Sequence, residues 1–206
     1  MIIAVLADDE LKGEFLEKGV PDKVEIVWAD SIQSLRIIEA EAYFDLLFEN
    51  DKERIARLKF LLPKPVFVNE VVFTVEDFIR INAWPTMLKR NITEVSTSSE
   101  NQKKFILAIL DQLGWSYQIV PDIPGMITPR IISMIINEAW YSLGENVSTR
   151  EEIDTAMKLG TNYPYGPFEW GDKIGLGRIK TLLGELQKTD ARYTIAPGLN
   201  GDFIWH

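Results

Sequence analysis

Side chains that transfer protons near neutral pH are nearly absent from this sequence. It has 206 residues, no cysteine and one histidine, His206, which is the last residue. Histidine is the side chain whose ordinary pKa makes it a base near pH 7, and cysteine supplies thiolate nucleophiles, disulfides and metal ligands. A terminal histidine is typical of a frayed end or the remnant of a tag. Neither a histidine base nor cysteine chemistry is therefore expected.

Acidic residues occupy the turn after the first predicted strand, which is the usual position of a phosphate-binding loop in this type of fold. The apolar run 2–7 is followed at once by Asp8, Asp9 and Glu10. A phosphate bound between a strand and a helix needs glycine for close approach of the backbone and the positive end of the helix. Carboxylates there repel phosphates, whereas the same residues stabilise the start of a helix through its dipole. We favour the second interpretation.

The overall charge argues against a polyanionic partner. The formal net charge is −9 at pH 7, and no run of Lys and Arg stands out. Nucleic-acid binding needs clustered basic side chains. No apolar run approaches the length that spans a bilayer. We therefore expect no nucleic-acid partner, no membrane partner and a cytoplasmic location.

The first half of the chain predicts strands that alternate with helices, the pattern of a parallel sheet covered by helices. Helices are expected over residues 9–18, 51–62 and 98–113. Strands are expected over residues 2–7, 24–28, 43–48, 65–68, 78–82, 92–95 and 115–120.

The second half predicts helices only. After the turn-rich segment 120–125, Thr128 and Pro129 are typical of an N-cap followed by proline at the first helical position. Apolar residues then occupy more than one ridge of this helix, which indicates cover on several sides, and one such cover is a second copy of the chain. Residues 149–152 form a capping-box pattern, and Gly160 is expected to end the helix that it opens.

Five motifs follow one another from residue 122 onward. They are Asp122-Ile123-Pro124-Gly125-Met126-Ile127, Asn137-Glu138-Ala139, the run 153–160, the run 164–169 and the run 172–176. This ordered series resembles the C-terminal helical domain of the NAD-dependent 3-hydroxyacyl-CoA dehydrogenases. The runs 44–49 and 92–95 resemble two strands of that family's dinucleotide-binding domain.

The resemblance implies a fold of the α/β class in two parts. Residues 1–120 would form a reduced, degenerate Rossmann-like domain with a parallel sheet, and residues 121–206 an all-helical domain. In that family the helical domain makes the dimer contact and helps to hold the acyl-CoA. The chain is therefore expected to form a homodimer through its helical domain and to take an acyl-CoA-like ligand.

Most of the family's working residues have no counterpart at the matching positions. Its glycine-rich turn is replaced by the acidic stretch 6–13. Its catalytic histidine falls on Ile81 or Asn82, its serine near Val71 and its asparagine on Pro129. Glu94 is kept, and the family role of that glutamate is to orient the histidine.

Glu94 and Asn82 are the candidate catalytic residues that remain. Asn82 would hydrogen-bond a thioester carbonyl, or it is a buried and satisfied amide. Glu94 would line a pocket, or it is a solvent-facing carboxylate of a strand. Trp84, beside the lost catalytic position, would fill the emptied pocket. No cofactor-binding residue and no metal ligand is assigned.

Three other features have an ordinary structural explanation. Lys89 and Arg90 would meet a CoA phosphate, or they are a solvated charge pair. The pair Gly166-Pro167 is expected to fix a turn, and Asp172 to cap the following helix.

The leading hypothesis is a catalytically impaired relative of 3-hydroxyacyl-CoA dehydrogenase. It would bind an acyl-CoA-like ligand or act as a dimeric scaffold, and no cofactor is expected. The alternative is an active NAD-dependent 3-hydroxyacyl-CoA dehydrogenase of fatty-acid metabolism with an altered site that uses Glu94 and Asn82. A third hypothesis is a structural partner of a separate enzyme chain.

Overall fold

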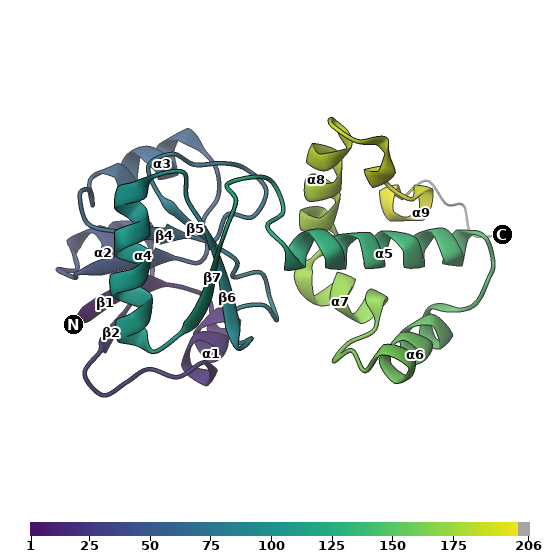
Figure 1. The fold of residues 1–206 in the computed structure, drawn as a ribbon, viewed down its shortest axis with the longest axis horizontal. Coiled ribbons are helices and arrows are strands. Elements are labelled where there is room, and N and C mark those ends of the chain that lie inside the picture. The colour runs from purple at the N-terminus through teal and green to yellow at the C-terminus, as the bar shows by residue number, and fades with distance from the viewer. Residues whose placement is uncertain (202–206) are drawn as a thin grey trace. The chain divides into compact units, whose positions relative to one another are not determined.

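The computed structural model describes residues 1–201, so the expectation for His206 falls outside the described residues. The chain divides into two compact units, Met1–Met126 and Ile127–His206, and each is described by itself (Figure 1). The division lies six residues beyond the boundary placed after residue 120. The turn-rich segment stays with the first unit because the backbone N–H of Gly125 donates to the carbonyl oxygen of Val71 at 2.8 Å. Within residues 1–201, no helix has the length and apolar character needed to cross a bilayer.

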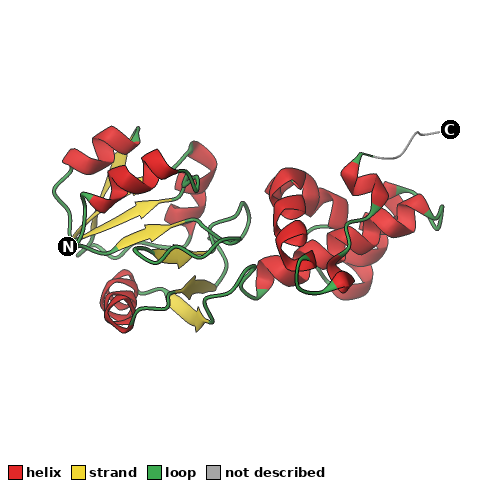
Figure 2. Ribbon diagram, turned by 90° about the horizontal axis from the view of Figure 1, so that it is seen from above, coloured by secondary structure: helices red, strands yellow, loops and turns green. Residues whose placement is uncertain are grey.

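The first unit is a seven-stranded sheet in the order β2-β1-β3-β4-β5-β6-β7, with helices on both faces (Figure 2). Its strands are β1 (Ile2–Leu6), β2 (Glu25–Ala29), β3 (Ala42–Asp45), β4 (Val66–Val68), β5 (Ile79–Ile81), β6 (Ile92–Ser96) and β7 (Ser116–Val120). Its helices are α1 (Asp9–Glu17), α2 (Ile32–Ile37), α3 (Lys52–Lys59) and α4 (Glu100–Leu113).

The sheet is mostly parallel, and one pair departs from the predicted parallel arrangement. Strands β5 and β6 pair antiparallel, with Arg80 opposite Ser96 and Ile81 opposite Val95. Residues 82–91 contain turns and no helix, so the chain reverses there instead of crossing over. This reversal brings the segment after β5 beside the start of β6, where the candidate residues lie.

Two apolar clusters fill the two faces of the sheet. On one face, Phe15 of α1 and Ile106 of α4 pack with Phe44 of β3. On the other face, Leu35 of α2 and Leu58 of α3 pack in the cluster that contains Tyr43, the residue of β3 before Phe44. Helix α2 is the element that the sequence pattern did not predict, because it is only 6 residues long.

The second unit is helical. Its elements are α5 (Thr128–Gly144), α6 (Arg150–Thr161), α7 (Pro167–Ile174), α8 (Leu176–Gln187), the 3-10 turn η1 (Ala191–Tyr193) and α9 (Pro197–Asn200). Helix α6 opens with the predicted capping box, in which the Thr149 side chain accepts from the Glu152 backbone. Residues 128–201 contain helices and no strand, which agrees with the expectation from sequence.

Two predicted helix ends in this unit are wrong. The N-cap of α5 is Ile127, so Thr128 is the first residue of the helix and not its N-cap. Helix α6 runs past Gly160 to Thr161, and its C-cap is Asn162, whose φ of 57° is left-handed. Asparagine tolerates this conformation better than most residues, so it serves as the stop that glycine was expected to provide.

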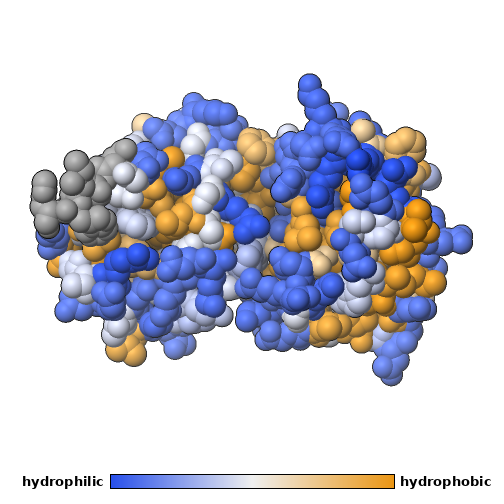
Figure 3. All heavy atoms as spheres, turned by 180° about the vertical axis from the view of Figure 1, so that it is seen from behind, coloured by the Kyte–Doolittle hydropathy of each residue, from blue (hydrophilic) through white to orange (hydrophobic). Residues whose placement is uncertain are grey.

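Apolar side chains also reach the surface of both units (Figure 3). In the first unit Ile37 is 85% exposed and Phe60 is 74% exposed. In the second, the exposed large apolar residues include Ile127, Ile131, Val147 and Leu159. Ile131 belongs to α5, the helix whose sequence indicated cover on several sides, and Ile127 is the N-cap of that helix.

Candidate functional site

The candidate residues Asn82 and Glu94 lie opposite each other at the end of the β5–β6 pair. The backbone N–H of Asn82 donates to the carbonyl oxygen of Glu94 at 2.9 Å, which continues the register of Ile81 with Val95. Ile81 and Val95 belong to the core. Because successive strand residues point to opposite faces, Asn82 and Glu94 share the face away from that core.

Both side chains are buried, so their chemistry depends on their immediate partners. Asn82 is 4% exposed and Glu94 is 7% exposed, which contradicts the solvent-facing alternative for Glu94. The side-chain oxygen of Asn82 accepts from the backbone N–H of Trp84 at 3.4 Å. Trp84 is itself buried. A carboxamide is not protonated or deprotonated near neutral pH, so Asn82 can donate or accept a hydrogen bond but cannot act as a base.

The position that resembles the family's serine holds Val71, which is 1% exposed. Its carbonyl oxygen accepts from the side chain of Arg80 at 3.3 Å and from Gly125 at 2.8 Å. The position that resembles the family's asparagine holds Pro129, which lies in the second unit at the start of α5. Neither position carries a side chain that can donate a hydrogen bond.

Arg80 is the residue near this site that the sequence reading did not single out. It is fully buried, and its Nε donates to the Asp122 carboxylate at 2.8 Å. Its other nitrogens donate to the carbonyl oxygens of Phe73 at 3.1 Å and Ile123 at 2.9 Å. Arg80 thus links β5 to the loop after β4 and to the segment that leaves the sheet. An arginine in the middle of the apolar stretch 78–82 was the signal available in the sequence.

The first strand-to-helix turn is closed by its own carboxylate. Asp8 is the N-cap of α1, and its side chain accepts from the backbone N–H of Leu11 at 2.9 Å. Asp9 and Glu10 form the exposed first turn of the helix. The acidic residues therefore begin a helix, as favoured from sequence. The N–H group of Leu11 is already used by Asp8.

The neighbouring strand end carries a buried ion pair. Strand order reverses between β1 and β3, and ligands of such sheets bind outside the carboxyl ends of the strands at this reversal. The last residue of β3, Asp45, is fully buried and receives two hydrogen bonds from Arg54 of α3, at 2.7 and 2.6 Å. The chain at this reversal therefore carries the carboxylate of Asp8 at α1 and the ion-paired carboxylate of Asp45 at β3.

A second buried carboxylate holds the turn that follows Asn82. Glu14 of α1 is 6% exposed and accepts from the backbone N–H groups of Thr86 and Lys89. Burial raises the pKa of Glu14 above its usual value, and the two backbone donors oppose that shift. Lys89 of the small basic pair lies 3.9 Å from the carboxylate of Glu17, so a nearby acid partly neutralises it.

The predicted turn in the second unit has a structural role. Gly166 is the N-cap of α7, and a Cβ added to it would lie 2.3 Å from the side chain of Asp154. That carboxylate accepts from the backbone N–H groups of Phe168 and Glu169 at 2.8 and 3.1 Å. Asp172 does not cap the next helix as expected, because it lies within α7 and the N-cap of α8 is Gly175.

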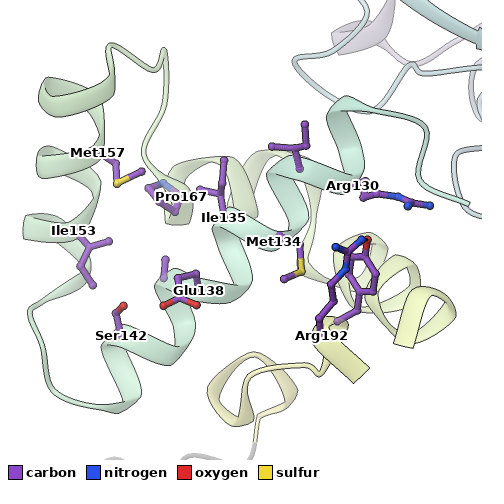
Figure 4. Close-up of a pocket in the computed structure, with 12 residues that line it drawn as sticks. Arg130, Met134, Ile135, Glu138, Ser142, Ile153, Met157, Pro167 and Arg192 are labelled. Carbon is purple, nitrogen blue, oxygen red and sulfur yellow. The ribbon is translucent and has the colours of Figure 1, made fainter. Parts of the chain in front are cut away.

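An open groove runs along α5 within the second unit (Figure 4). We call it the α5 groove, and its volume is about 560 Å³. It is lined by Arg130, Ile131, Met134, Ile135, Glu138, Ala139, Ser142, Ile153, Met157, Pro167, Arg192 and Tyr193. Its walls come from α5, α6, the start of α7 and η1. Among residues 1–201, no cluster of three or more His, Cys, Asp or Glu side chains is arranged to hold a metal ion.

Residues 125–199 match the family model described as the 3-hydroxyacyl-CoA dehydrogenase C-terminal domain. The 3-hydroxyadipyl-CoA dehydrogenase of Escherichia coli is 41% identical over 96 residues, which is 47% of this chain and 20% of that protein. A probable 3-hydroxybutyryl-CoA dehydrogenase of Bacillus subtilis is 32% identical over 119 residues, which is 57% of this chain and 42% of that protein. The chain thus spans less than half the length of these relatives.

The fold of the whole chain is also similar to that of solved dehydrogenases. The crystal structure of (S)-3-hydroxybutyryl-CoA dehydrogenase from Ralstonia eutropha superposes with a TM-score of 0.72, covering 97% of this chain and 92% of that chain at 20% identity. At this identity the structural similarity supports the fold alone. That fold is a Rossmann-like α/β unit followed in the chain by a helical unit.

Proposed function

Since this chain is a relative of the 3-hydroxyacyl-CoA dehydrogenases and carries their C-terminal domain at residues 125–199, we propose that it binds an acyl-CoA-like ligand without oxidising it. The observation that carries the proposal is the pair formed by Asn82 and Glu94. It keeps a hydrogen-bonding amide and a carboxylate at the end of β5 and β6 but includes no histidine.

Oxidation of a 3-hydroxyacyl group requires a base for the hydroxyl proton as the hydride leaves. A general base typically contributes about two to four orders of magnitude in rate. Asn82 cannot take that proton, and the sequence has no histidine before residue 206. The amide of Asn82 can still donate a hydrogen bond to a thioester carbonyl, which is a binding role.

The first turn does not fit a dinucleotide bound in the usual manner. The pyrophosphate would need the N–H groups at the start of α1, and the Asp8 carboxylate already accepts from one of them. Like unit charges about 4 Å apart repel by roughly 4 kcal/mol at an effective dielectric constant of 20. We therefore expect no bound NAD and derive no step that uses it.

The alternative is an active NAD-dependent dehydrogenase in which Glu94 is the base and the cofactor binds in another manner. The names of the relatives favour it, because each describes a dehydrogenase of an acyl-CoA. Glu94 lies beside Asn82 in the first unit. The proposed base and the amide that would hydrogen-bond the thioester carbonyl are therefore adjacent. Kinetics on the intact chain decide between the two hypotheses.

The deciding experiment compares binding with turnover. Calorimetric titration with a short-chain 3-hydroxyacyl-CoA should give heat, and titration with NAD or NADH should give none at millimolar concentration. CoA without an acyl group and the Asn82→Ala variant are the matched controls for the thioester contact. Steady NADH formation that is abolished by Glu94→Gln would establish the alternative. No binding of any of these ligands would leave the scaffold hypothesis, in which the chain supports a separate enzyme.

We also propose that the chain forms a homodimer through its helical unit. Ile131 of α5 is 54% exposed and lines the apolar α5 groove, so part of the helix has no cover from its own unit. Burying such a surface against a second copy removes apolar area from water. Light scattering at micromolar concentration should report twice the mass of one chain. A monomer at this concentration would contradict the proposal.

A further inference from the structure

The loop between β5 and β6 makes backbone hydrogen bonds with charged side chains of α1. This loop, residues 82–91, begins with Asn82 and leads to the strand that carries the candidate carboxylate. We call it the β5–β6 loop. The carboxylate of Glu14 accepts from the backbone N–H groups of Thr86 and Lys89 at 2.5 and 3.3 Å. One buried carboxylate therefore holds the middle of the loop at two N–H groups.

Lys18 holds the end of the same loop. It is the C-cap of α1 and follows Glu14 by one helical turn, so both side chains lie on one face of the helix. The ammonium of Lys18 donates to the carbonyl oxygen of Arg90 and, at 3.4 Å, to that of Asn91. It also lies 5.3 Å from the centre of the Trp115 ring. Burial lowers the pKa of Lys18 to about 8, as expected for an ammonium enclosed between a helix and a loop.

The backbone of the β5–β6 loop is strained at the residue that Glu14 contacts. Thr86 has a φ of 75°, a left-handed conformation that β-branched residues rarely adopt. Such a conformation persists only where the surrounding structure holds it. The hydroxyl of Thr86 is buried and has no hydrogen-bond partner within the described part of the chain, so it does not supply that hold. The contact of its N–H group with Glu14 therefore stabilises the shape of the loop.

We propose that Glu14 and Lys18 are positioning residues that hold the amide of Asn82 in place through the β5–β6 loop. The inference rests on the proposed binding role of Asn82 and names the residues that set its position. The side-chain oxygen of Asn82 accepts from the backbone N–H of Trp84, which belongs to this loop. The backbone N–H of Asn82 donates to Glu94 at the other side. A loop released from α1 would therefore shift the amide relative to Glu94.

Hydrogen exchange on the full chain measures this positioning without a ligand. The backbone N–H of Asn82 is the reporter, because its hydrogen bond joins the two candidate residues. Lys18→Met removes the donors of the ammonium and keeps an apolar stem beside Trp115. We expect Lys18→Met and Glu14→Ala each to speed exchange of the Asn82 amide about tenfold, which corresponds to the loss of one or two hydrogen bonds. The amides of β1 should keep their wild-type rates, since local opening leaves the rest of the sheet closed.

Two further variants are the matched controls for this exchange experiment. Lys12 also lies on α1, with its ammonium 5.8 Å from the centre of the Trp28 ring, but it makes no hydrogen bond to the β5–β6 loop in the described structure. Lys12→Met should therefore leave exchange at Asn82 unchanged. Glu14→Gln keeps one acceptor and should retain most of the protection that Glu14→Ala loses. Equal acceleration at Asn82 and throughout β1 would show a general loss of stability and overturn the positioning role.

Calorimetric binding tests whether the two residues act through Asn82. We expect Lys18→Met to weaken binding of 3-hydroxybutyryl-CoA about threefold to tenfold and to leave binding of CoA without an acyl group unchanged. In the Asn82→Ala background, Lys18→Met should have no further effect, because the amide that it positions is gone. An additional loss of affinity in that background would overturn positioning through Asn82.

The two measurements also separate this inference from the proposed function. A wild-type chain that binds neither 3-hydroxybutyryl-CoA nor CoA overturns the proposed function, and exchange at Asn82 then decides the inference alone. Unchanged exchange at Asn82 in Glu14→Ala and Lys18→Met overturns the inference. Faster exchange with full affinity for 3-hydroxybutyryl-CoA overturns the positioning role and leaves the proposed function in place.

Discussion

The fully buried guanidinium of Arg80 lies 2.8 Å from the carboxylate of Asp122, which joins the middle of β5 to the segment that leaves the sheet. Ser96 of the neighbouring strand donates to the same carboxylate oxygen at 3.1 Å. The pair therefore holds together two strands and the end of the first unit.

Asp122→Ala should strongly destabilise the first unit because it leaves the buried charge of Arg80 without its carboxylate. Breaking a buried ion pair by removing one partner typically costs about 3–5 kcal/mol. The matched control is Asp77→Ala, since Lys59 and Asp77 pair at the same 2.8 Å with both side chains largely exposed. That change should cost no more than about 1 kcal/mol. Urea unfolding measures both, and similar losses in the two variants would contradict the argument from burial.

Gly166→Ala and Gly160→Ala should change the stability of the helical unit in opposite directions. The first places a Cβ 2.3 Å from Asp154, the side chain that caps α7, and overpacking of this kind costs about 1–3 kcal/mol. The second adds a Cβ inside α6 with nothing within 4 Å, so it should stabilise the helix by about 0.5–1 kcal/mol. Thermal unfolding of both variants tests the pair. Destabilisation by Gly160→Ala would show that α6 is constrained in a way that these contacts do not explain.

Glu14→Gln should remove part of the pH dependence of stability. Because burial raises the pKa of Glu14 in the folded chain, the folded state binds its proton more tightly than the unfolded state does. The contribution of Glu14 to stability therefore falls as pH rises from its usual pKa of 4.5 through the raised value, and then stays level. The variant should lack this fall, because glutamine does not titrate, and its single side-chain oxygen can still accept from the backbone N–H of Thr86.

Urea unfolding across the range from about pH 4 to pH 7 measures this difference. Glu17→Gln, at an exposed position of the same helix, is the control. A wild type that gains stability relative to Glu14→Gln as pH rises through this range would contradict the assigned direction.

Asp8→Ala should weaken the start of α1, whereas Asp8→Asn should not. Loss of an N-cap acceptor typically costs about 1 kcal/mol, and asparagine caps about as well as aspartate. The asparagine variant also removes one negative charge from the first turn while it keeps the hydrogen bond to Leu11. Calorimetry with NAD on both variants extends the test. Micromolar binding that appears in Asp8→Asn alone would show that charge, and not the missing glycines, excludes the dinucleotide.

Local sequence was sufficient for much of the fold. Short apolar or alternating runs predicted a strand at each of the seven positions of the sheet, because strand residues that face the core are apolar. The capping box at Thr149 fixed the start of α6 through contacts between residues three apart. The ordered motifs after residue 122 indicated the domain that residues 125–199 match. Each of these features depends on neighbours in the chain or on a series of short patterns.

Tertiary structure decided the features that depend on residues distant in sequence. The antiparallel return of β6 beside β5 placed Asn82 against Glu94, and no local pattern carries the direction of a strand. The buried partner of Arg80 is Asp122, which is 42 residues away in the chain. The role of Gly166 likewise follows from its contact with Asp154 on another helix. Sequence patterns indicate local propensity and burial, whereas the partner of a buried charge is determined by the tertiary contacts of the folded chain.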